Sequence, residues 1–392
     1  MRAYSRLAAA LVAVGSLAAN PIEELQERLD SGALKLESRS PRGYLDSLLE
    51  ALNISPLTQT LVFSKTSAQF RLISPRSPRA LYFNDEVYVG WVRGGPFLEV
   101  STADADRGAV FYTLDQTPRK RPRFTLDNGQ CLQCHESSRT GQIPGHLTRS
   151  VHPGVDGLPV FRLGTTNVDQ ATPLAERFGG WFVTGPQFTH LGNRGLPDRD
   201  NPDSIQPLGL SDVISLDNYL RPKSDVVAHL LLAHQTQMHN RIARAALEAR
   251  KALTYRKEMA GRFGEVSDSL KASVKRRIER PAEQLLEYLL FADEAPLPGG
   301  LADDSPLKQL FAERGPLYEL DLETRLMRTP LSYLIRSAAF DALPPETLAY
   351  LVGRLDDVLT GQDTSARFDH LSPNDRAAIR RMLAEWKPSL LR

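Results

Sequence analysis

The chain has 392 residues, of which 41% are hydrophobic and 24% charged, as in a globular protein of one large or two ordinary domains. The 48 Lys and Arg residues balance the 47 Asp and Glu residues, which excludes a basic footprint for nucleic acid and an acidic tail. The cysteine count, two, excludes a small domain held together by disulfides.

The first residues have the pattern of a secretory signal peptide. Arg2 and Arg6 precede an apolar run over 7–14, and small residues up to Ala18 supply a cleavage site. We expect a signal peptide over 1–19; the alternative is an apolar first helix of the fold. The run is too short for a permanent membrane span, and no later segment is long and apolar enough. We therefore expect a soluble periplasmic protein with no stable membrane span.

Residues 20–125 are expected to form two helices followed by a sheet. Leu and Ile recur at helical spacing over 22–30 and 44–52. From residue 58 to residue 115, short β-branched or aromatic runs alternate with Pro, Gly, Asn and Asp, which is typical of antiparallel strands joined by turns. The expected strands are 61–63, 70–73, 80–83, 87–92 and 110–114, with a tight turn over 83–87.

Both cysteines lie in the pentapeptide Cys131-Leu132-Gln133-Cys134-His135, which has the C-x-x-C-H signature of covalent haem c attachment. Two thiols at this spacing reach the two vinyl groups of one porphyrin, and the histidine that follows turns its imidazole onto the iron. We therefore expect Cys131 and Cys134 to hold one haem and His135 to be its proximal axial ligand. Export supports this expectation, because c-type haem is attached on the outer side of the bacterial inner membrane.

Three alternatives for the cysteine pair remain open. A thioredoxin-like disulfide requires the motif to begin a helix after a strand in a βαβ unit, whereas 126–130 is typical of a loop. A zinc site requires further His, Asp or Glu ligands, because there is no third cysteine. Coincidence is the third alternative.

Residues 126–207 are the expected haem-attachment segment, with a loop-rich pocket. Gly and Pro are dense over 140–145 and 151–157, which indicates loops that wrap an object. Two further strands are expected at 158–163 and 180–185. His146, His152 and His190 lie in this segment, and each is a candidate for a ligand, an acid–base group or a propionate contact as well as for a structural role.

Residues 208–392 are expected to be mainly helical. The clearest helix covers 225–250, where Asp225 begins it and apolar residues recur at helical spacing. Further helices are expected at 267–279, 282–291, 306–313, 345–359 and 374–385. The predicted fold class is therefore α+β, with a small antiparallel sheet in the N-terminal half, a mainly helical C-terminal half, and haem c between them.

The long helix is the expected source of the distal haem ligand. A small cytochrome c has a Met ligand some tens of residues after C-x-x-C-H, but the next methionine in this chain is Met238. His234 and Met238 fall one turn apart on one apolar stripe of the helix, and His239 lies on the adjoining face. We expect one of the three to face the iron, with His234 as the first candidate. The alternative is that each is a packed core residue.

These features predict a periplasmic monohaem c-type cytochrome that transfers electrons, as a carrier or as the redox subunit of an oxidoreductase. Its partner would be a redox protein or a small-molecule oxidant or reductant. A haem enzyme of peroxidase type and a haem-based small-molecule sensor are the alternatives, because the group opposite His135 decides between electron transfer and ligand chemistry.

Short motifs outside the haem signature are spread over most of the chain: Ser74-Pro75-Arg76, Pro78-Arg79-Ala80, Tyr82-Phe83, Tyr88-Val89-Gly90, Ile143-Pro144-Gly145, 176–185, His190-Leu191-Gly192-Asn193, His234-Gln235, His239-Asn240 and Ser332-Tyr333-Leu334-Ile335. Together with C-x-x-C-H, this set resembles a family of exported bacterial proteins described only as cytochrome c domain-containing. The resemblance implies haem and export, and it implies no particular substrate. The family usually has Met where this chain has Leu191, so a Met at that place is a poor candidate for an essential ligand.

Overall fold

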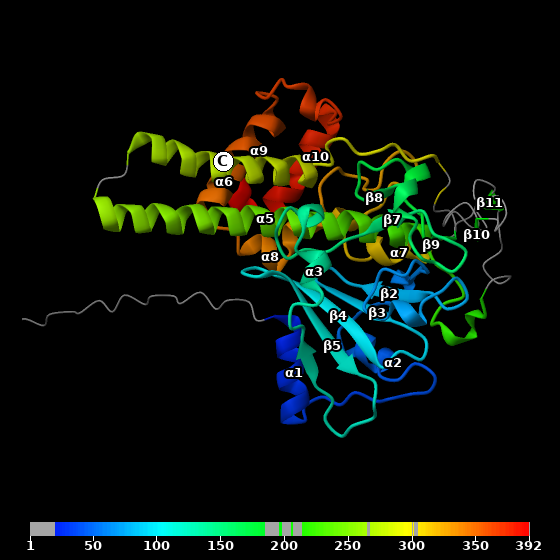
Figure 1. The fold of residues 1–392 in the computed structure, drawn as a ribbon. Helices are drawn as coiled ribbons and strands as arrows, with labels where there is room; N and C mark the ends of the chain where they lie inside the picture. The colour runs from blue at the N-terminus through cyan, green and yellow to red at the C-terminus, as the bar shows by residue number, and fades with distance from the viewer. Residues whose placement is uncertain are drawn as a thin grey trace, which may run out of the picture.

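A seven-stranded antiparallel sheet with helices on both faces organises the chain (Figure 1). The structure, a computed structural model, describes residues 20–184, 214–264, 267–299, 301 and 305–391, and only the backbone at 196–197 and 205–206. The predicted signal peptide and His190 lie outside the described residues. The predicted α+β class, with the sheet in the N-terminal half and helices in the C-terminal half, is confirmed.

The sheet has the strand order β6-β5-β4-β3-β2-β1-β9, and every neighbouring pair is antiparallel. Its strands are β1 (Thr60–Val62), β2 (Arg79–Phe83), β3 (Val87–Trp91), β4 (Phe97–Asp104), β5 (Gly108–Asp115), β6 (Phe124–Leu126) and β9 (Trp181–Phe182). Two short antiparallel pairs lie outside it: β7 (Arg149–Val151) with β8 (Thr165–Asn167), and β10 (Leu196–Pro197) with β11 (Ile205–Gln206).

The helices fall in two groups on opposite sides of the sheet. In Figure 1, α5 and α6 run side by side across one face with α9 and α10 beyond them, and α1 and α2 lie on the other side. The helices are α1 (Pro21–Ser31), α2 (Leu45–Ala51), α3 (Leu132–His135), α5 (Val226–Phe263), α6 (Asp268–Leu289), α7 (Pro306–Ala312), α8 (Ala338–Asp341), α9 (Pro345–Thr360) and α10 (Pro373–Trp386). In the described residues, no helix is long and apolar enough for a membrane span.

Each face of the sheet has its own hydrophobic core. Residues such as Tyr82, Val89 and Trp91 pack with α1 and α2 on one face. A larger core joins the opposite face to α5, α6, α9 and α10. Alternate residues of a strand point to opposite faces, so Tyr88 belongs to the second core while Val89 belongs to the first.

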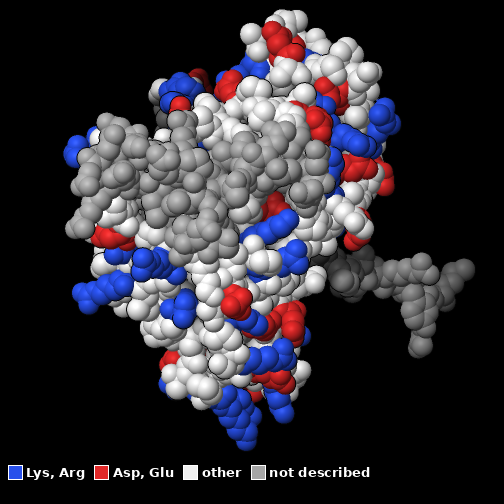
Figure 2. Space-filling model, turned by 90° about the vertical axis from the view of Figure 1, so that its right-hand side faces the viewer, with Lys and Arg blue, Asp and Glu red and all other residues white. Residues whose placement is uncertain are grey.

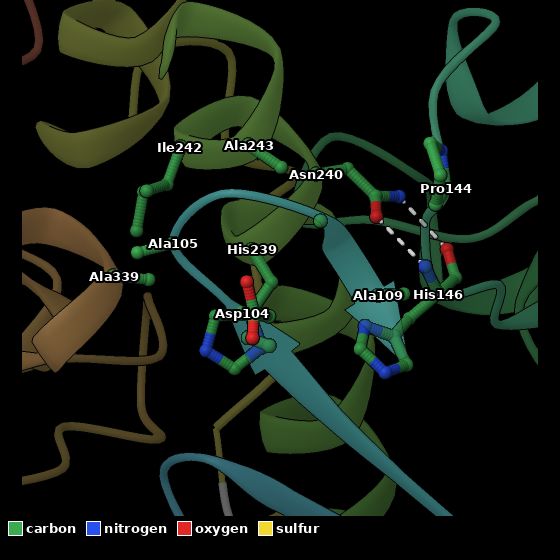
Figure 3. A pocket seen from close by; sticks show the side chains of 12 residues that line it. Asp104, Ala105, Ala109, Pro144, His146, His239, Asn240, Ile242, Ala243 and Ala339 are labelled. Carbon is green, nitrogen blue, oxygen red and sulfur yellow. Dashed lines mark hydrogen bonds between the residues drawn. The ribbon is translucent and has the colours of Figure 1, made fainter. Parts of the chain in front are cut away.

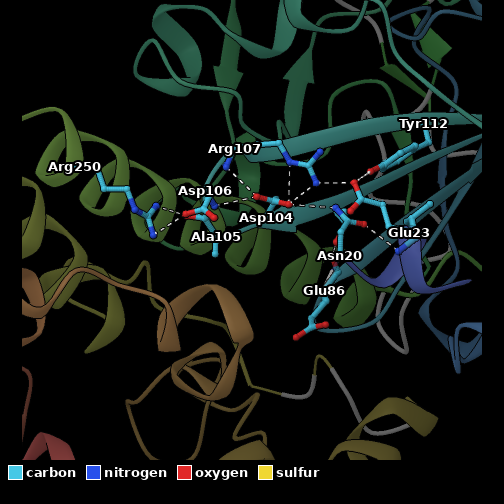
Figure 4. A network of polar contacts seen from close by, with 11 residues as sticks. Asn20, Glu23, Glu86, Asp104, Ala105, Asp106, Arg107, Tyr112 and Arg250 are labelled. Atoms are coloured by element: carbon cyan, nitrogen blue, oxygen red, sulfur yellow. Dashed lines mark hydrogen bonds and ion pairs between the residues drawn. The ribbon is translucent and has the colours of Figure 1, made fainter. Parts of the chain in front are cut away.

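A polar network fixes the β4–β5 turn against helices from both groups (Figure 4). Arg107 binds Asp104 and Glu23 of α1, and Asn20, the N-cap of α1, also reaches Asp104. Arg250 of α5 pairs with Asp106 at 3.1 Å. The turn therefore joins the start of the chain, the sheet and the long helix.

Asp225 begins α5 as the sequence predicts. Its Oδ1 accepts a hydrogen bond from the backbone N–H of Val227 at 2.8 Å, which satisfies one of the free donors of the first turn. The helix continues to Phe263, past the predicted end, because Ala245, Ala249 and Ala252 extend its buried face against α6.

Some predicted elements are wrong. Residues 70–72 and 161–163 form short 3-10 helices in place of strands, and their apolar side chains, such as Phe70 and Phe161, are exposed. Strand β4 was not predicted, although Leu98 and Val100 alternate with polar neighbours. The two helices predicted over 267–291 are one helix, α6, which contains Pro281.

The face shown in Figure 2 has Lys and Arg side chains interspersed with Asp and Glu side chains. This agrees with the near-neutral composition of the chain.

Gly180 directly precedes the edge strand β9 and hydrogen-bonds to the residues that follow the neighbouring strand β1. Its carbonyl accepts hydrogen bonds from the N–H groups of Phe63 and Ser64, and its φ of 84° is in the left-handed region. An added Cβ would also lie 2.7 Å from the Cβ of Ser64. We expect Gly180→Ala to lower the free energy of unfolding by about 1–3 kcal/mol. Urea unfolding tests this against Gly32→Ala, whose φ is also positive but whose Cβ meets nothing within 4 Å. Equal losses in the two variants would contradict the role of the close contact.

Candidate functional site

The two cysteines lie on one helical turn, α3, which follows the edge strand β6. The N–H groups of Cys134 and His135 both donate to the carbonyl of Cys131, at 3.1 and 3.0 Å. Asp127 holds the loop before this turn, because its Oδ2 accepts from the N–H groups of Gly129 and Cys131, at 2.9 and 3.0 Å. Both thiols are free, with Cys131 half-buried and Cys134 exposed. Residues three apart on a helix share one face, so the two sulfurs are placed for one ligand.

The imidazole of His135 is oriented by a backbone carbonyl. Its Nδ1 lies 2.9 Å from the carbonyl oxygen of Gly145, and the N–H of Gly145 donates to the carbonyl of His135 at 2.8 Å. A carbonyl can only accept, so Nδ1 has the proton and Nε2 has the free lone pair. Histidine ligands of metals almost always donate their other N–H in this way. The pair of thiols and the oriented Nε2 therefore fit the donor set of a covalent haem c.

The loop that supplies Gly145 is held by α5 (Figure 3). The side-chain amide of Asn240 accepts from the N–H of His146 and donates to its carbonyl, both at 2.8 Å. Thr148 of the same loop hydrogen-bonds Thr236 at 3.0 Å. Because Nε2 of His135 points away from Gly145, α5 supports the imidazole from the side opposite to Nε2.

We expect Asn240→Ala to lower the free energy of unfolding by about 2–4 kcal/mol, because it leaves two buried backbone groups of His146 without a partner. Urea unfolding measures this loss. Lys251→Ala, at an exposed position of the same helix, is the control, with an expected loss below ~0.5 kcal/mol. A loss in the Asn240 variant no larger than in the control would contradict the anchoring role.

Five stacked or tilted rings, Phe83, Tyr88, His146, Phe111 and His135, form a continuous series that we name the ring row. Successive centroids are 6.4, 4.4, 5.8 and 4.6 Å apart. Phe83, Tyr88 and Phe111 come from β2, β3 and β5, on the sheet face that α5 covers.

Ser101 of β4 explains how a loop histidine enters this row. It is the cross-strand partner of both Tyr88 and Phe111, so a small side chain stands between the two rings. The imidazole of His146 fills that space and its Nε2 lies 3.1 Å from the Ser101 Oγ. Burial lowers the pKa of His146 well below its usual value, so the row has an uncharged ring at this place near neutral pH.

A half-buried ion pair lies beside the motif on the same sheet face. Glu99, the cross-strand partner of Gly90, pairs with Arg79 at 2.5 Å and accepts from Ser67 at 2.8 Å. The field of this carboxylate reaches Cys131 and His135. Because Arg79 neutralises it, the site has no net charge from this pair.

His234, the first candidate for the distal ligand, has both ring nitrogens engaged. Nδ1 lies 3.0 Å from the Gln170 Oε1 and Nε2 lies 2.8 Å from the Ser332 Oγ. The ring stacks on Phe291 at a centroid distance of 4.5 Å. These contacts describe a satisfied core histidine, and a ligand role would require the hydrogen bond to Ser332 or to Gln170 to break.

His239 and Met238 have different surroundings. The Nδ1 of His239 lies 2.8 Å from the Tyr88 hydroxyl, while its buried Nε2 has no hydrogen-bond partner in the described residues. This histidine lines a cavity of ≈ 10 Å³ with His146 (Figure 3), which is room for about one water molecule. Met238 is fully buried in the core. The distal ligand among His234, His239 and Met238 stays a prediction, and His239 is the one with a free nitrogen.

The geometry does not support a redox disulfide or a zinc site at the cysteine pair. Burial and the nearby Asp127 raise the pKa of the Cys131 thiol to about 12, whereas a thiol–disulfide catalyst needs a lowered pKa. The turn α3 follows an edge strand of an antiparallel sheet and not a strand of a βαβ unit. No cluster of three or more His, Cys, Asp or Glu suited to a metal ion occurs in the part of the chain that the structure describes.

Comparisons with family models, with curated proteins and with solved structures find no match to this chain. A function for this chain is therefore proposed below from the residues of the candidate site. The sequence predicts Cys131, Cys134 and His135 as site residues, but it does not predict the contacts that Gly145, Asn240 and Phe111 make around them. The Ile143-Pro144-Gly145 segment was a signal for a loop but not for the carbonyl contact.

Proposed function

We propose that this chain is a periplasmic monohaem c-type cytochrome that transfers electrons, as a carrier or as the redox subunit of an oxidoreductase. The observation that supports this most is the joint placement of Cys131, Cys134 and His135, with the His135 Nδ1 engaged by Gly145 and Nε2 left free. Histidine ligands of metals donate a hydrogen bond from one ring nitrogen and keep the other free, and His135 has this arrangement next to two free thiols on one turn.

Each residue of the site has a separate task in this proposal. Cys131 and Cys134 would form the two thioether bonds, and the His135 Nε2 would be the proximal ligand. Gly145 fixes the tautomer and the orientation of the imidazole, and Asn240 fixes the loop that contains Gly145. Haem c supplies reversible one-electron chemistry when it is bound.

Export is part of the proposal and is supported by the sequence of residues 1–19. An exported chain meets the compartment where haem is attached through sulfur.

Absorption spectra of the purified exported protein distinguish this function from its alternatives. Electron transfer predicts low-spin haem bands in both the ferric and the ferrous state. A high-spin ferric form that reacts with peroxide would indicate the peroxidase type, and a five-coordinate ferrous form that binds gas without turnover would indicate the sensor. A protein without any haem bands would overturn the proposal.

A further inference from the structure

A large cleft opens at the end of the ring row that is farthest from His135. Its volume is ≈ 760 Å³, within the range of small-molecule sites. Apolar walls come from α2 and the segment after it, such as Leu49 and Ile54, and from α7, with Leu310 and Phe311. Phe83, the first ring of the ring row, forms part of its surface.

Gln235 lies at the floor of the cleft, and hydrogen bonds within the protein hold its side chain in place. The Gln235 Nε2 donates to the carbonyl of Asn84 at 2.6 Å, and its Oε1 accepts from the Tyr333 hydroxyl at 2.9 Å. Gln235 is 1% exposed and comes from α5, the helix that also anchors the Gly145 loop. A rigid floor lowers the cost of ordering a bound molecule.

The charges around the cleft disfavour an anion. Four carboxylates and two guanidinium groups line it. The guanidinium of Arg314 is already engaged by Asp85 and lies over the Tyr318 ring at 3.8 Å. Glu50 is exposed and reaches Arg39 only at 3.6 Å, so its charge remains available at the rim. The cleft therefore suits a neutral or cationic molecule with an apolar body.

The ring row connects this cleft to the proximal histidine without a break. Its five rings lead from Phe83 at the cleft, through Tyr88, His146 and Phe111, to His135. Packed rings give electrons a better path than water-filled or empty space would. Neither a bare carrier nor a structural core requires both a cleft of this size and such a connection.

We propose that the cleft binds a small aromatic redox molecule, neutral or cationic, of the quinol, phenol or aromatic amine class, and that the ring row passes its electrons toward His135. This inference rests on the proposed function. For a hydroquinone, one molecule loses two electrons and two protons. A haem held by Cys131, Cys134 and His135 would accept one electron in its ferric state, so one hydroquinone would reduce two copies of the chain, and the protons would pass to water in the open cleft.

Binding of 1,4-naphthoquinone to the purified full-length protein, measured by calorimetry, tests the site. Leu310→Trp places bulk in the cleft and is expected to weaken binding at least tenfold. Gln309→Trp adds the same bulk on the exposed side of the same helix and is expected to bind as the wild type does. The anionic 2-sulfonate of the same quinone is expected to bind at least tenfold more weakly than the neutral compound. Equal binding by both variants, or no binding by the wild type, would overturn the inference.

Reduction of the haem, followed by absorbance, tests the redox part. Leu310→Trp should slow reduction by 1,4-naphthohydroquinone at least tenfold and leave reduction by dithionite unchanged, because dithionite needs no aromatic site. Equal slowing of both reductants would contradict a role for the cleft. If the protein contains haem but Leu310→Trp changes neither quinone binding nor reduction by the hydroquinone, this inference alone is wrong. If the protein contains no haem, the proposed function itself is wrong.

Discussion

Replacement of both Cys131 and Cys134 by serine is expected to yield an exported chain without haem bands after denaturation in acid. Thioether bonds survive denaturation, whereas a haem held only by His135 dissociates when the fold is lost. Serine is close in size to cysteine, and both thiols lie at the surface turn α3, so the fold should persist. The expected loss of covalent haem is complete.

Gln133→Ala is the matched control for this variant, because Gln133 is an exposed residue between the two cysteines. It should retain the haem bands of the wild type. Circular dichroism of both variants shows whether the chain has folded. A folded double-serine variant that keeps its bands through acid denaturation would contradict attachment through sulfur.

Replacement of His229 by phenylalanine is expected to make the protein more resistant to acid. His229 is fully buried, and neither ring nitrogen has a hydrogen-bond partner in the described residues. Its ring lies edge-on to Trp181 and Phe178, at centroid distances of 4.7 and 4.9 Å. Burial first, and then the charge of Arg177, lower the pKa of His229 to about 3.

The direction of the pH effect follows from proton binding. The unfolded chain binds a proton at the usual histidine pKa, about 6.5, whereas the folded chain does not bind one until the pH is far lower. The free energy of unfolding of the wild type therefore falls as the pH drops from about 6.5 toward 3. At pH 4.5 this loss is about 3 kcal/mol, since each pH unit contributes ~1.4 kcal/mol.

Urea unfolding at pH 7.5 and at pH 4.5 measures this effect. The His229→Phe variant should lose about 3 kcal/mol less than the wild type between the two conditions. His370→Gln, at an exposed histidine, is the control and should follow the wild type. An acid dependence of the His229 variant that equals that of the wild type would show that His229 is not held neutral in the core.

Local features of the fold were predictable because their causes lie within a few residues. Asp225 followed by an apolar periodic run predicts the start of α5, and the Asn84 turn between β2 and β3 follows from its polar residues. The strands predicted around Phe70 and Phe161 are wrong because a short apolar run shows no periodicity that distinguishes a strand from a 3-10 turn. Two helices were expected on either side of Pro281, but packing of Leu285 and Leu289 keeps α6 continuous.

The candidate site also has features that local sequence predicts and features that depend on distant residues. The spacing of Cys131, Cys134 and His135 is a local pattern, so the sequence alone was sufficient to propose them as a site. The ring row depends on which residues of β2, β3 and β5 stand opposite one another, and this register is not readable from periodicity alone. The satisfied environment of His234 likewise depends on Gln170 and Ser332, which are far away in sequence.

The mass of the purified exported protein after full denaturation tests the central claim most directly. We expect the mass of the processed chain plus one haem, with the red colour retained by the unfolded polypeptide. A mass equal to that of the processed chain alone, with no colour, would contradict the account.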